Sequence, residues 1–278
     1  MAEHLGEAWF RRWTERLESA VEANRLRHAW SPFQESPSKR LHPEGSAERG
    51  HARFLAALNQ PFALDLPGQI GRVGTEVSPY TGEPLGITYP RVDVDALYAA
   101  IGDAWPAWRA SSRRARAGVC LELLERWHQM TFENAYATMH TAGQGFMLAF
   151  AGSGASSLDR GLEALAMAWT LMSEVPETAT FERSFGRDGP VRLHKQYRLM
   201  PVGVAVVLSC GSYPAWNAYP AILANLVTGN PVVVKPHPDT ILPVAMAVRV
   251  ARSVLSEAGF DPNPVSYTHL TLPTKRIV

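Results

Sequence analysis

The fold of this chain is decided by residues 202–235, which read VGVAVVLSCGSYPAWNAYPAILANLVTGNPVVVK. Residues 202–209 are almost all apolar and half of them are β-branched, which is typical of a strand covered on both faces in a parallel sheet. The alanine-rich stretch from Pro214 to Gly229 has the first-turn proline and the terminal glycine of a helix. Residues 231–235 form a second apolar run. The segment therefore predicts a strand, a helix and a neighbouring parallel strand.

A second helix is predicted over residues 241–258, with Pro243 in its first turn and Gly259 after it. Strand, helix, strand and helix at this spacing make a βαβα unit with a right-handed crossover. Ligands of such sheets gather beyond the carboxyl ends of the strands. Residues 209–212 and 235–239 are therefore the candidate site. The predicted apolar face of the second helix consists of Val244, Val248, Ala251, Leu255 and Ala258.

Helices are also predicted on the amino-terminal side of this unit. Residues 1–30 should form an amphipathic helix, followed by an irregular, proline-rich connector over 31–45 and a short helix over 47–58. A later helix capped by Asp93 or Asp95 should be interrupted at Pro106. The apolar stripes that predict these and two further helices are Leu5, Trp9, Trp13, Leu17 and Val21; Leu97, Ala100, Ile101 and Ala104; Val119, Leu123, Leu124, Trp127 and Met130; and Leu162, Leu165, Ala166, Trp169 and Met172.

Three segments are predicted to be less regular. Turn residues at 78–84 separate two β-prone pieces, 72–77 and 85–89, which indicates a small hairpin. The glycine-rich stretch 143–154 lacks the order of a dinucleotide-binding loop and indicates a flexible turn. Apolar and basic residues alternate from Val191, as in a strand with one wet face.

Composition narrows the class of protein. The chain has 278 residues, 46% of them hydrophobic, and a formal net charge of +1, so it lacks the basic excess that nucleic acid or membrane binding leaves. Two cysteines, Cys120 and Cys210, make neither a disulfide framework nor a metal site, and we expect a cytoplasmic protein without a bound metal. The longest apolar run, 202–208, is too short to span a bilayer.

Several motifs resemble a known family. PVGV at 201–204, TGNPVVVKP at 228–236 and EAGF at 257–260 resemble the coenzyme domain of the aldehyde dehydrogenase superfamily, and SPYTGEPLG at 78–86 and AWPAWRASSRRAR at 104–116 resemble its earlier part. CGSYPAWNAYP at 210–220 and KPHP at 235–238 are most similar to the phenylacetic acid degradation branch, PaaN.

The resemblance implies an α/β fold and a division of the chain. We expect a helical N-terminal extension over 1–70 and an incomplete, Rossmann-like coenzyme-binding domain with a parallel sheet over 71–264. Residues 265–278 read VSYTHLTLPTKRIV, which resembles translated adapter read-through, so we expect them to be a non-native tail.

The resemblance also implies roles at the second candidate segment. Lys235 stands where the family's lysine binds the adenosine ribose or the 2′-phosphate of NADP; the alternative is a solvated lysine at a strand end. Pro238 occupies the position of a glutamate that repels the 2′-phosphate in NAD-preferring members. His237 could add positive charge there, or be an exposed turn histidine. We therefore expect NADP as cofactor, with NAD as the alternative.

In the first segment, Ser212 stands where many members have an asparagine that donates to the oxyanion. The alternative role for Ser212 is the N-cap of the following helix. Ser209, Cys210 and Gly211 would line the nicotinamide side through their backbone. Asn217 is interpreted as a helix-surface amide.

The resemblance implies oxidation of an aldehyde, here a ring-opened semialdehyde carried as a coenzyme A thioester in phenylacetate catabolism. That chemistry needs a cysteine nucleophile and a glutamate base. Neither Cys120 nor Cys210 matches the nucleophile, and no glutamate matches the base, so we expect an inactive fragment of an oligomeric enzyme whose dimer-forming strands are partly present at 191–200. The alternatives are a non-catalytic nucleotide-binding or interaction module and an acyl-CoA reductase of the same fold.

Overall fold

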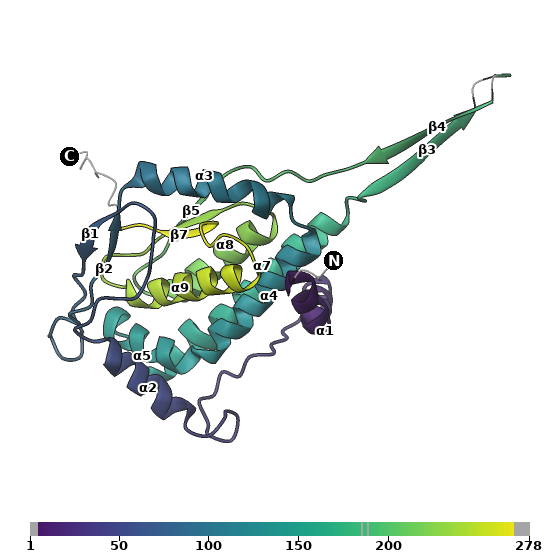
Figure 1. Ribbon diagram of the computed structural model, residues 1–278. Helices are drawn as coiled ribbons and strands as arrows, with labels where there is room; N and C mark the ends of the chain where they lie inside the picture. The colour runs from purple at the N-terminus through teal and green to yellow at the C-terminus, as the bar shows by residue number, and fades with distance from the viewer. Residues whose placement is uncertain (1–4, 185, 188, 270–278) are drawn as a thin grey trace, which may run out of the picture.

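The computed structural model describes residues 5–184, 186, 187 and 189–269. Its centre is a parallel sheet of three strands in the order β5-β6-β7, where β5 is Ala205–Leu208, β6 is Val232–Lys235 and β7 is Val265–Tyr267. Helices α8 (Pro214–Val227) and α9 (Leu242–Glu257) connect and cover these strands. In Figure 1, α3 (Val94–Ala110) runs along one side of the sheet and α9 along the other. The predicted βαβα unit is confirmed.

The sheet is buried unequally. The side chains of Val232, Val233 and Val234 in the central strand are buried, as the sequence predicts for a strand covered on both faces. In β5, only Val207 is buried, whereas Val206 is 54% and Leu208 59% exposed. The prediction that this strand is covered on both faces is therefore wrong: Val206 and Leu208 lie on one face of β5, and that face is exposed. Among the described residues, β5 pairs only with β6.

A layer of helices supports the sheet. It contains α4 (Arg113–Gln129), α5 (Thr131–Ala142) and α7 (Ser156–Ser173). Trp127 of α4 stacks on Tyr219 of α8 with ring centroids 4.0 Å apart, and its indole N–H donates to the Ala247 carbonyl of α9 at 3.1 Å. One aromatic side chain thus joins three helices in the core.

The amino-terminal helix α1 (Leu5–Leu26) crosses α4 at two glycines. A Cβ atom added to Gly118 would lie 1.9 Å from the backbone oxygen of Gly6, so the close approach needs glycine at this position. The predicted stripe is buried at Trp9 and Leu17, but Leu5 is exposed at the helix end. The helix α2 (Ser46–Ala57) and the irregular connector before it also agree with prediction.

The predicted hairpin is wider than expected. Strands β1 (Gln69–Val73) and β2 (Tyr89–Val92) pair antiparallel, and between them only the bridge from Val77 to Pro84 joins the inner segments within the described residues. The two inner strands predicted at 72–77 and 85–89 are therefore mostly wrong. Prolines in this stretch remove ladder donors, and the chain is held by turn bonds instead.

Two expectations about helix breakers are also wrong. Asp93 caps α3 as predicted, but Pro106 lies inside the helix and does not end it. The buried Ile101 and Trp108 on either side of the proline offset the one backbone hydrogen bond that it removes. The glycine-rich stretch is not a turn beyond Gly145, because α6 (Phe146–Phe150) and a π-helix (Ala151–Ala155) continue into α7.

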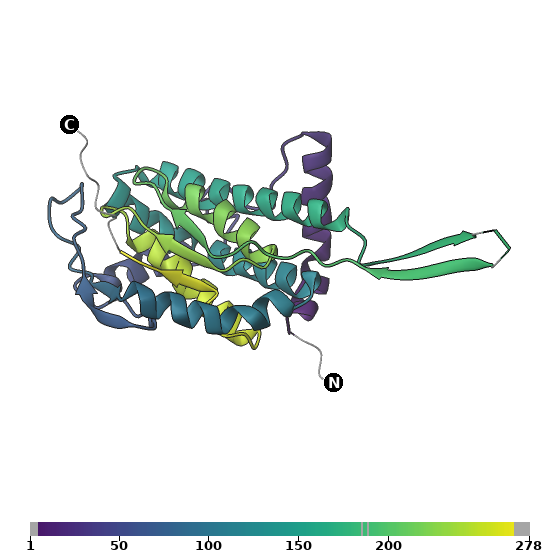
Figure 2. The ribbon, with the colours of Figure 1, turned by 90° about the horizontal axis from the view of Figure 1, so that it is seen from above.

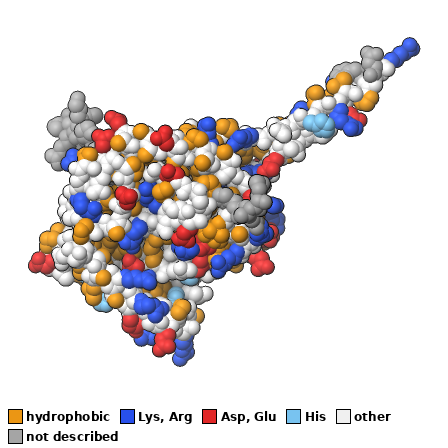
Figure 3. Space-filling view, viewed as in Figure 1, with side chains coloured by type: hydrophobic (Ala, Val, Ile, Leu, Met, Phe, Trp, Pro, Cys, Tyr) orange, Lys and Arg blue, Asp and Glu red, His pale blue; other side chains and the backbone are white. Residues whose placement is uncertain are grey.

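Strands β3 (Thr178–Ser184) and β4 (Pro190–Gln196) form an antiparallel arm that projects from the body (Figures 1 and 2). Every residue of β4 is exposed, so the prediction of one wet and one dry face is wrong for this chain. Figure 3 shows hydrophobic and basic side chains along the arm.

At the other end of the chain, β7 extends the sheet with buried side chains. Residues 270–278 of the predicted non-native tail lie outside the described residues, and its origin stays a prediction. Within the described part of the chain, no helix is both long and apolar enough to cross a membrane.

Candidate functional site

The two candidate segments meet at the carboxyl edge of the sheet. Leu208 and Lys235 are paired across β5 and β6, and the Ser209 N–H donates to the Lys235 carbonyl at 2.9 Å. The next residues stay together, because the Thr240 hydroxyl donates to the Cys210 carbonyl at 3.2 Å. This arrangement is the one that the sequence predicts.

Gly211 of the first segment is in contact with His237 of the second. A Cβ atom on Gly211 would lie 3.2 Å from Nδ1 of His237, so the imidazole ring packs against the bare glycine backbone. The Asp239 N–H donates to His237 Nδ1 at 3.2 Å, and the Asp239 carboxylate lies 3.7 Å from the same nitrogen. Position 238 has no carboxylate, but position 239 does.

Asn217 holds the turn after β5. Its side-chain oxygen accepts a hydrogen bond from the Cys210 N–H at 2.9 Å, so the interpretation as a helix-surface amide is wrong. One turn into α8, this side chain points back at the turn that precedes the helix. The Ser209 hydroxyl donates to the Pro214 carbonyl at 3.1 Å and closes the same turn.

Ser212 is exposed in this turn. The N-cap of α8 is Tyr213, without a side-chain capping bond, so the alternative role of Ser212 as the N-cap is wrong. The Ser212 hydroxyl lies 3.9 Å from Cys210 Sγ, which also accepts from the Tyr213 N–H at 3.4 Å. The Ser212 hydroxyl therefore lies at the surface of the turn.

A buried residue that the sequence analysis missed supports the turn. The Gln144 amide donates to the Ser212 carbonyl at 2.5 Å and accepts from the Ser153 hydroxyl at 3.0 Å. Asn134 donates to the Ser153 carbonyl at 2.9 Å, so a chain of polar groups connects α5, the π-helix and the turn. A glutamine between two glycines was the only sequence signal for it.

Lys235 lies half-buried beside a pocket of about 360 Å³. The walls come from β6 and the segment after it, from the β1–β2 region and from the chain end: Arg72, Val73, Thr75, Arg91, Val92, Lys235, Pro236, Pro238, Ile241, Thr268 and His269. No hydrogen-bond acceptor or ion-pair partner is found for the Lys235 ammonium among the described residues. The ammonium is therefore available as a point donor.

Glu76 is a second residue that sequence reasoning missed. Its buried carboxylate accepts from the N–H groups of Ile241 and Leu242, at 2.5 and 2.9 Å, and from the Tyr89 hydroxyl at 2.5 Å. It therefore ties the β1–β2 loop to the start of α9. Burial raises the pKa of Glu76 to about 7, against the lowering effect of its three hydrogen bonds.

The two cysteines lie in different surroundings. Cys120 is completely buried in α4, and burial raises the pKa of its thiol far above the usual range. Cys210 is half-buried in the turn, and its sulfur already accepts a hydrogen bond. Both thiols are free, and the described residues contain no cluster that could hold a metal ion.

Comparisons with known proteins agree with this geometry. Residues 70–269 match the model of the aldehyde dehydrogenase family. The crystal structure of an NAD-dependent aldehyde dehydrogenase from Burkholderia multivorans is 44% identical, with a TM-score of 0.92 over 96% of this chain and 48% of that chain.

Two more distant structures show the fold alone. A 1-pyrroline-5-carboxylate dehydrogenase variant from Thermus thermophilus is 18% identical, with a TM-score of 0.63 over 86% of this chain and 46% of that one. The NAD+ complex of a Bacillus cereus aldehyde dehydrogenase is 19% identical, with a TM-score of 0.58 over 78% and 43%. This chain spans about half the length of these structures. No curated protein matches it.

Proposed function

The chain belongs to the aldehyde dehydrogenase family, and we propose that its βαβα unit binds the nicotinamide dinucleotide of an NAD(P)-dependent aldehyde dehydrogenase. One observation carries the proposal: the Lys235 ammonium, without an acceptor in the described chain, lies at the same sheet edge as the turn 209–212. Both lie where ligands of parallel α/β sheets bind.

The residues present fit such a cofactor. Lys235 would donate to an adenosine ribose hydroxyl or a phosphate, with His237 and Pro238 beside it. The backbone of Ser209, Cys210 and Gly211 would line the nicotinamide side, with the His237 ring packed against Gly211. When bound, the dinucleotide supplies the hydride acceptor. Ser212 would donate to the oxygen of the aldehyde at the turn surface.

We propose NADP as the cofactor, with NAD as the alternative. Support for NADP comes from Pro238, which leaves no carboxylate at that position to repel a 2′-phosphate. Support for NAD comes from the name of the Burkholderia protein and from the Asp239 carboxylate next along the chain. Titration with both reduced dinucleotides decides between them, and tighter binding of NADH would remove the NADP proposal.

The substrate proposed is a ring-opened semialdehyde, carried as a coenzyme A thioester, in phenylacetate catabolism. The motifs at 210–220 and 235–238 support it. We further propose that this chain alone does not oxidise aldehydes, since Cys120 is buried and the Cys210 sulfur belongs to the turn. Formation of NADPH or NADH from an aldehyde by the purified chain would contradict this. An acyl-CoA reductase is distinguished by its use of coenzyme A.

The assembly proposed is a homo-oligomer in the cytoplasm, with contacts made through the exposed arm. The cytoplasmic location is supported by the two free thiols.

Binding of the dinucleotide is tested on the full chain by the fluorescence of NADPH. Lys235→Ala should weaken binding about tenfold, as expected for the loss of one charge-assisted hydrogen bond. Lys39→Ala is the matched control, because Lys39 is an exposed lysine of the connector before α2. Equal affinities of the Lys235→Ala protein and the unmodified protein would overturn the role of Lys235.

A further inference from the structure

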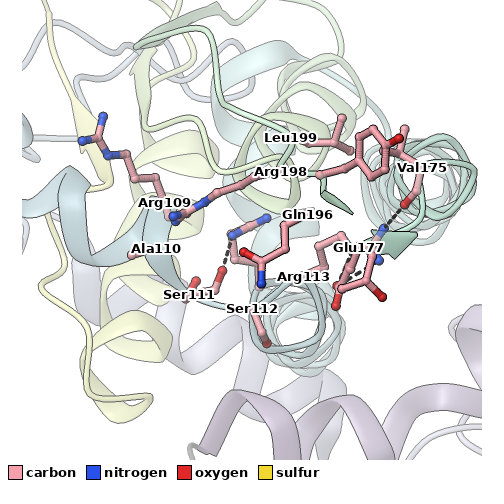
Figure 4. Close-up of a pocket in the computed structure, with 13 residues that line it drawn as sticks. Arg109, Ala110, Ser111, Ser112, Arg113, Val175, Glu177, Gln196, Arg198 and Leu199 are labelled. Carbon is pink, nitrogen blue, oxygen red and sulfur yellow. Dashed lines mark hydrogen bonds and ion pairs between the residues drawn. The ribbon is translucent and has the colours of Figure 1, made fainter. Parts of the chain in front are cut away.

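A cavity of about 380 Å³ lies at the base of the arm (Figure 4). Its walls come from the junction of α3 and α4 and from the two chain segments that enter and leave the arm: Arg109, Ala110, Ser111, Ser112, Arg113, Arg116, Val175, Glu177, Thr178, Gln196, Tyr197, Arg198 and Leu199. Residues 196–199, which line the cavity, precede β5 in the sequence, so the cavity lies toward the amino end of that strand. It shares no residue with the pocket beside Lys235.

The side chains that line the cavity carry an excess of positive charge. Four arginines and one glutamate line it, which leaves an excess of three positive charges (4 − 1 = 3). Arg113 and Glu177 form an ion pair at 2.9 Å, so one arginine is compensated. Arg109 lies over the Trp105 ring at 5.5 Å, and Figure 4 shows its guanidinium turned away from that of Arg113. Arg116 and Arg198 remain without a carboxylate partner in the described part of the chain.

Arg116 is the anchor of this group. Its side chain is only 5% exposed, with Nε donating to the Val227 carbonyl at 2.9 Å and Nη1 to the Ser111 carbonyl at 2.6 Å. Within the described residues, Nη2 has no acceptor. Burial lowers the pKa of Arg116, and the nearby charges of Arg198 and Arg113 lower it further. Bringing these guanidinium groups together costs free energy that an anion would offset.

The start of α4 adds a second, independent reason to expect an anion. The amino end of a helix carries a partial positive charge and favours acidic side chains, yet the first turn of α4 has no acid and contains Arg113, Arg114 and Arg116. Glu7 of α1 accepts from the Ser112 hydroxyl, and it does not line the cavity. The amino end of α4 and the arginines therefore both favour an anion in the cavity.

We propose that this cavity binds a phosphate group, either free or on a small organic phosphate. Guanidinium forks match phosphate oxygens in pairs. A phosphate monoester carries a charge of about −1.5 to −2 at neutral pH, whereas a carboxylate carries −1, so phosphate compensates the excess better. Arg198 and Arg116 are the ligands, and Arg113 contributes its positive charge, because its donors already bond to Glu177 and to the Met172 and Val175 carbonyls.

The test is isothermal titration of the full chain with inorganic phosphate and with glycerol phosphate, at constant ionic strength. Both should bind saturably; tighter binding of glycerol phosphate identifies an organic phosphate as the ligand, and equal or tighter binding of inorganic phosphate identifies the free ion. Absence of saturable binding for both overturns the proposal.

Variants locate the binding. Arg198→Gln should weaken it about tenfold, Arg198→Lys should weaken it less because the charge remains, and Arg40→Gln in the connector before α2 should leave it unchanged. Arg198 is exposed, so its replacement should leave the circular dichroism spectrum unchanged. Unchanged affinity in Arg198→Gln overturns the proposal, as does loss of phosphate binding in Lys235→Ala, which would place the phosphate at the other pocket.

Discussion

The Gln144 amide donates to the Ser212 carbonyl at 2.5 Å, across 68 positions of sequence. Ser212 belongs to the turn after β5, and Gln144 belongs to the loop between α5 and α6. The contact is buried on the Gln144 side, so the turn that we propose to face the aldehyde is fixed from behind by a residue outside the βαβα unit.

Replacement of Gln144 by leucine should destabilise the protein. It leaves the Ser212 carbonyl and the Ser153 hydroxyl without their partner, and a buried polar group without a partner costs about 1–3 kcal/mol. The free energy of unfolding from urea titration measures the effect. Gln129→Leu is the control, because Gln129 is exposed and bonds only to Glu125 of its own helix; an equal loss in both variants would contradict the role of Gln144.

Glu76 should make stability depend on pH. Its pKa is about 7 in the folded chain and 4.5 as its ordinary value, so between these values the folded state holds more protons than the unfolded state. Stability should therefore fall as pH rises from about 4.5 to 7, by an amount on the order of 3 kcal/mol.

Denaturant titrations from pH 5 to pH 8 measure this effect. Glu76→Gln should remove most of the slope and should be more stable than the unmodified protein at pH 8. Glu83→Gln changes an exposed carboxyl in the same loop and should keep the slope. A Glu76→Gln protein that keeps the full slope would show that other groups cause it.

The crossing of α1 and α4 should not tolerate a methyl group. In Gly118→Ala, the new Cβ would meet the Gly6 oxygen at 1.9 Å and the Phe10 nitrogen at 2.6 Å, both of them backbone atoms that cannot rotate away. Overpacking of this kind costs about 1–3 kcal/mol. Gly102→Ala in α3 is the control, because no atom lies within 4 Å of its Cβ position, and alanine there should stabilise by about 0.5–1 kcal/mol. Thermal unfolding of both variants checks the opposite signs.

The arm should govern self-association if the proposed oligomer forms through it. Phe181 and Leu193 are exposed partners across the two strands. The double variant Phe181→Ser, Leu193→Ser should shift the mass measured by sedimentation towards the monomer without lowering the stability of the body. The cross-strand pair Thr180 and His194, replaced by alanine, is the control. An unchanged mass in the first variant would move the interface elsewhere.

The sequence predicts the βαβα unit because its signals are local: two valine-rich runs, a helix between them, and glycines at the helix ends. The meeting of residues 209–212 with Lys235 follows from that order. Gln144 and Glu76 escape prediction because their contacts join residues 68 and 165 positions apart, and neither residue has a periodic pattern around it.

The wrong predictions also arise where contacts between distant parts of the chain outweigh local sequence signals. Pro106 remains in a helix because tertiary burial outweighs a local signal, and the glycines at 143–154 allow a π-helix where the composition alone indicates a turn. Asn217 acts on the turn that precedes its own helix, which residue type alone does not reveal.

The contact of α1 with α4 has a consequence for synthesis of the chain. Trp13 donates to Glu122 at 2.9 Å, and these residues are 109 positions apart. At translation rates of about 5–20 residues per second, α1 leaves the ribosome on the order of ten seconds before its partner helix exists. During that interval the apolar side chains of α1, Trp9, Phe10 and Leu17, lack the partner helix that buries them in the folded chain, and they are exposed to water.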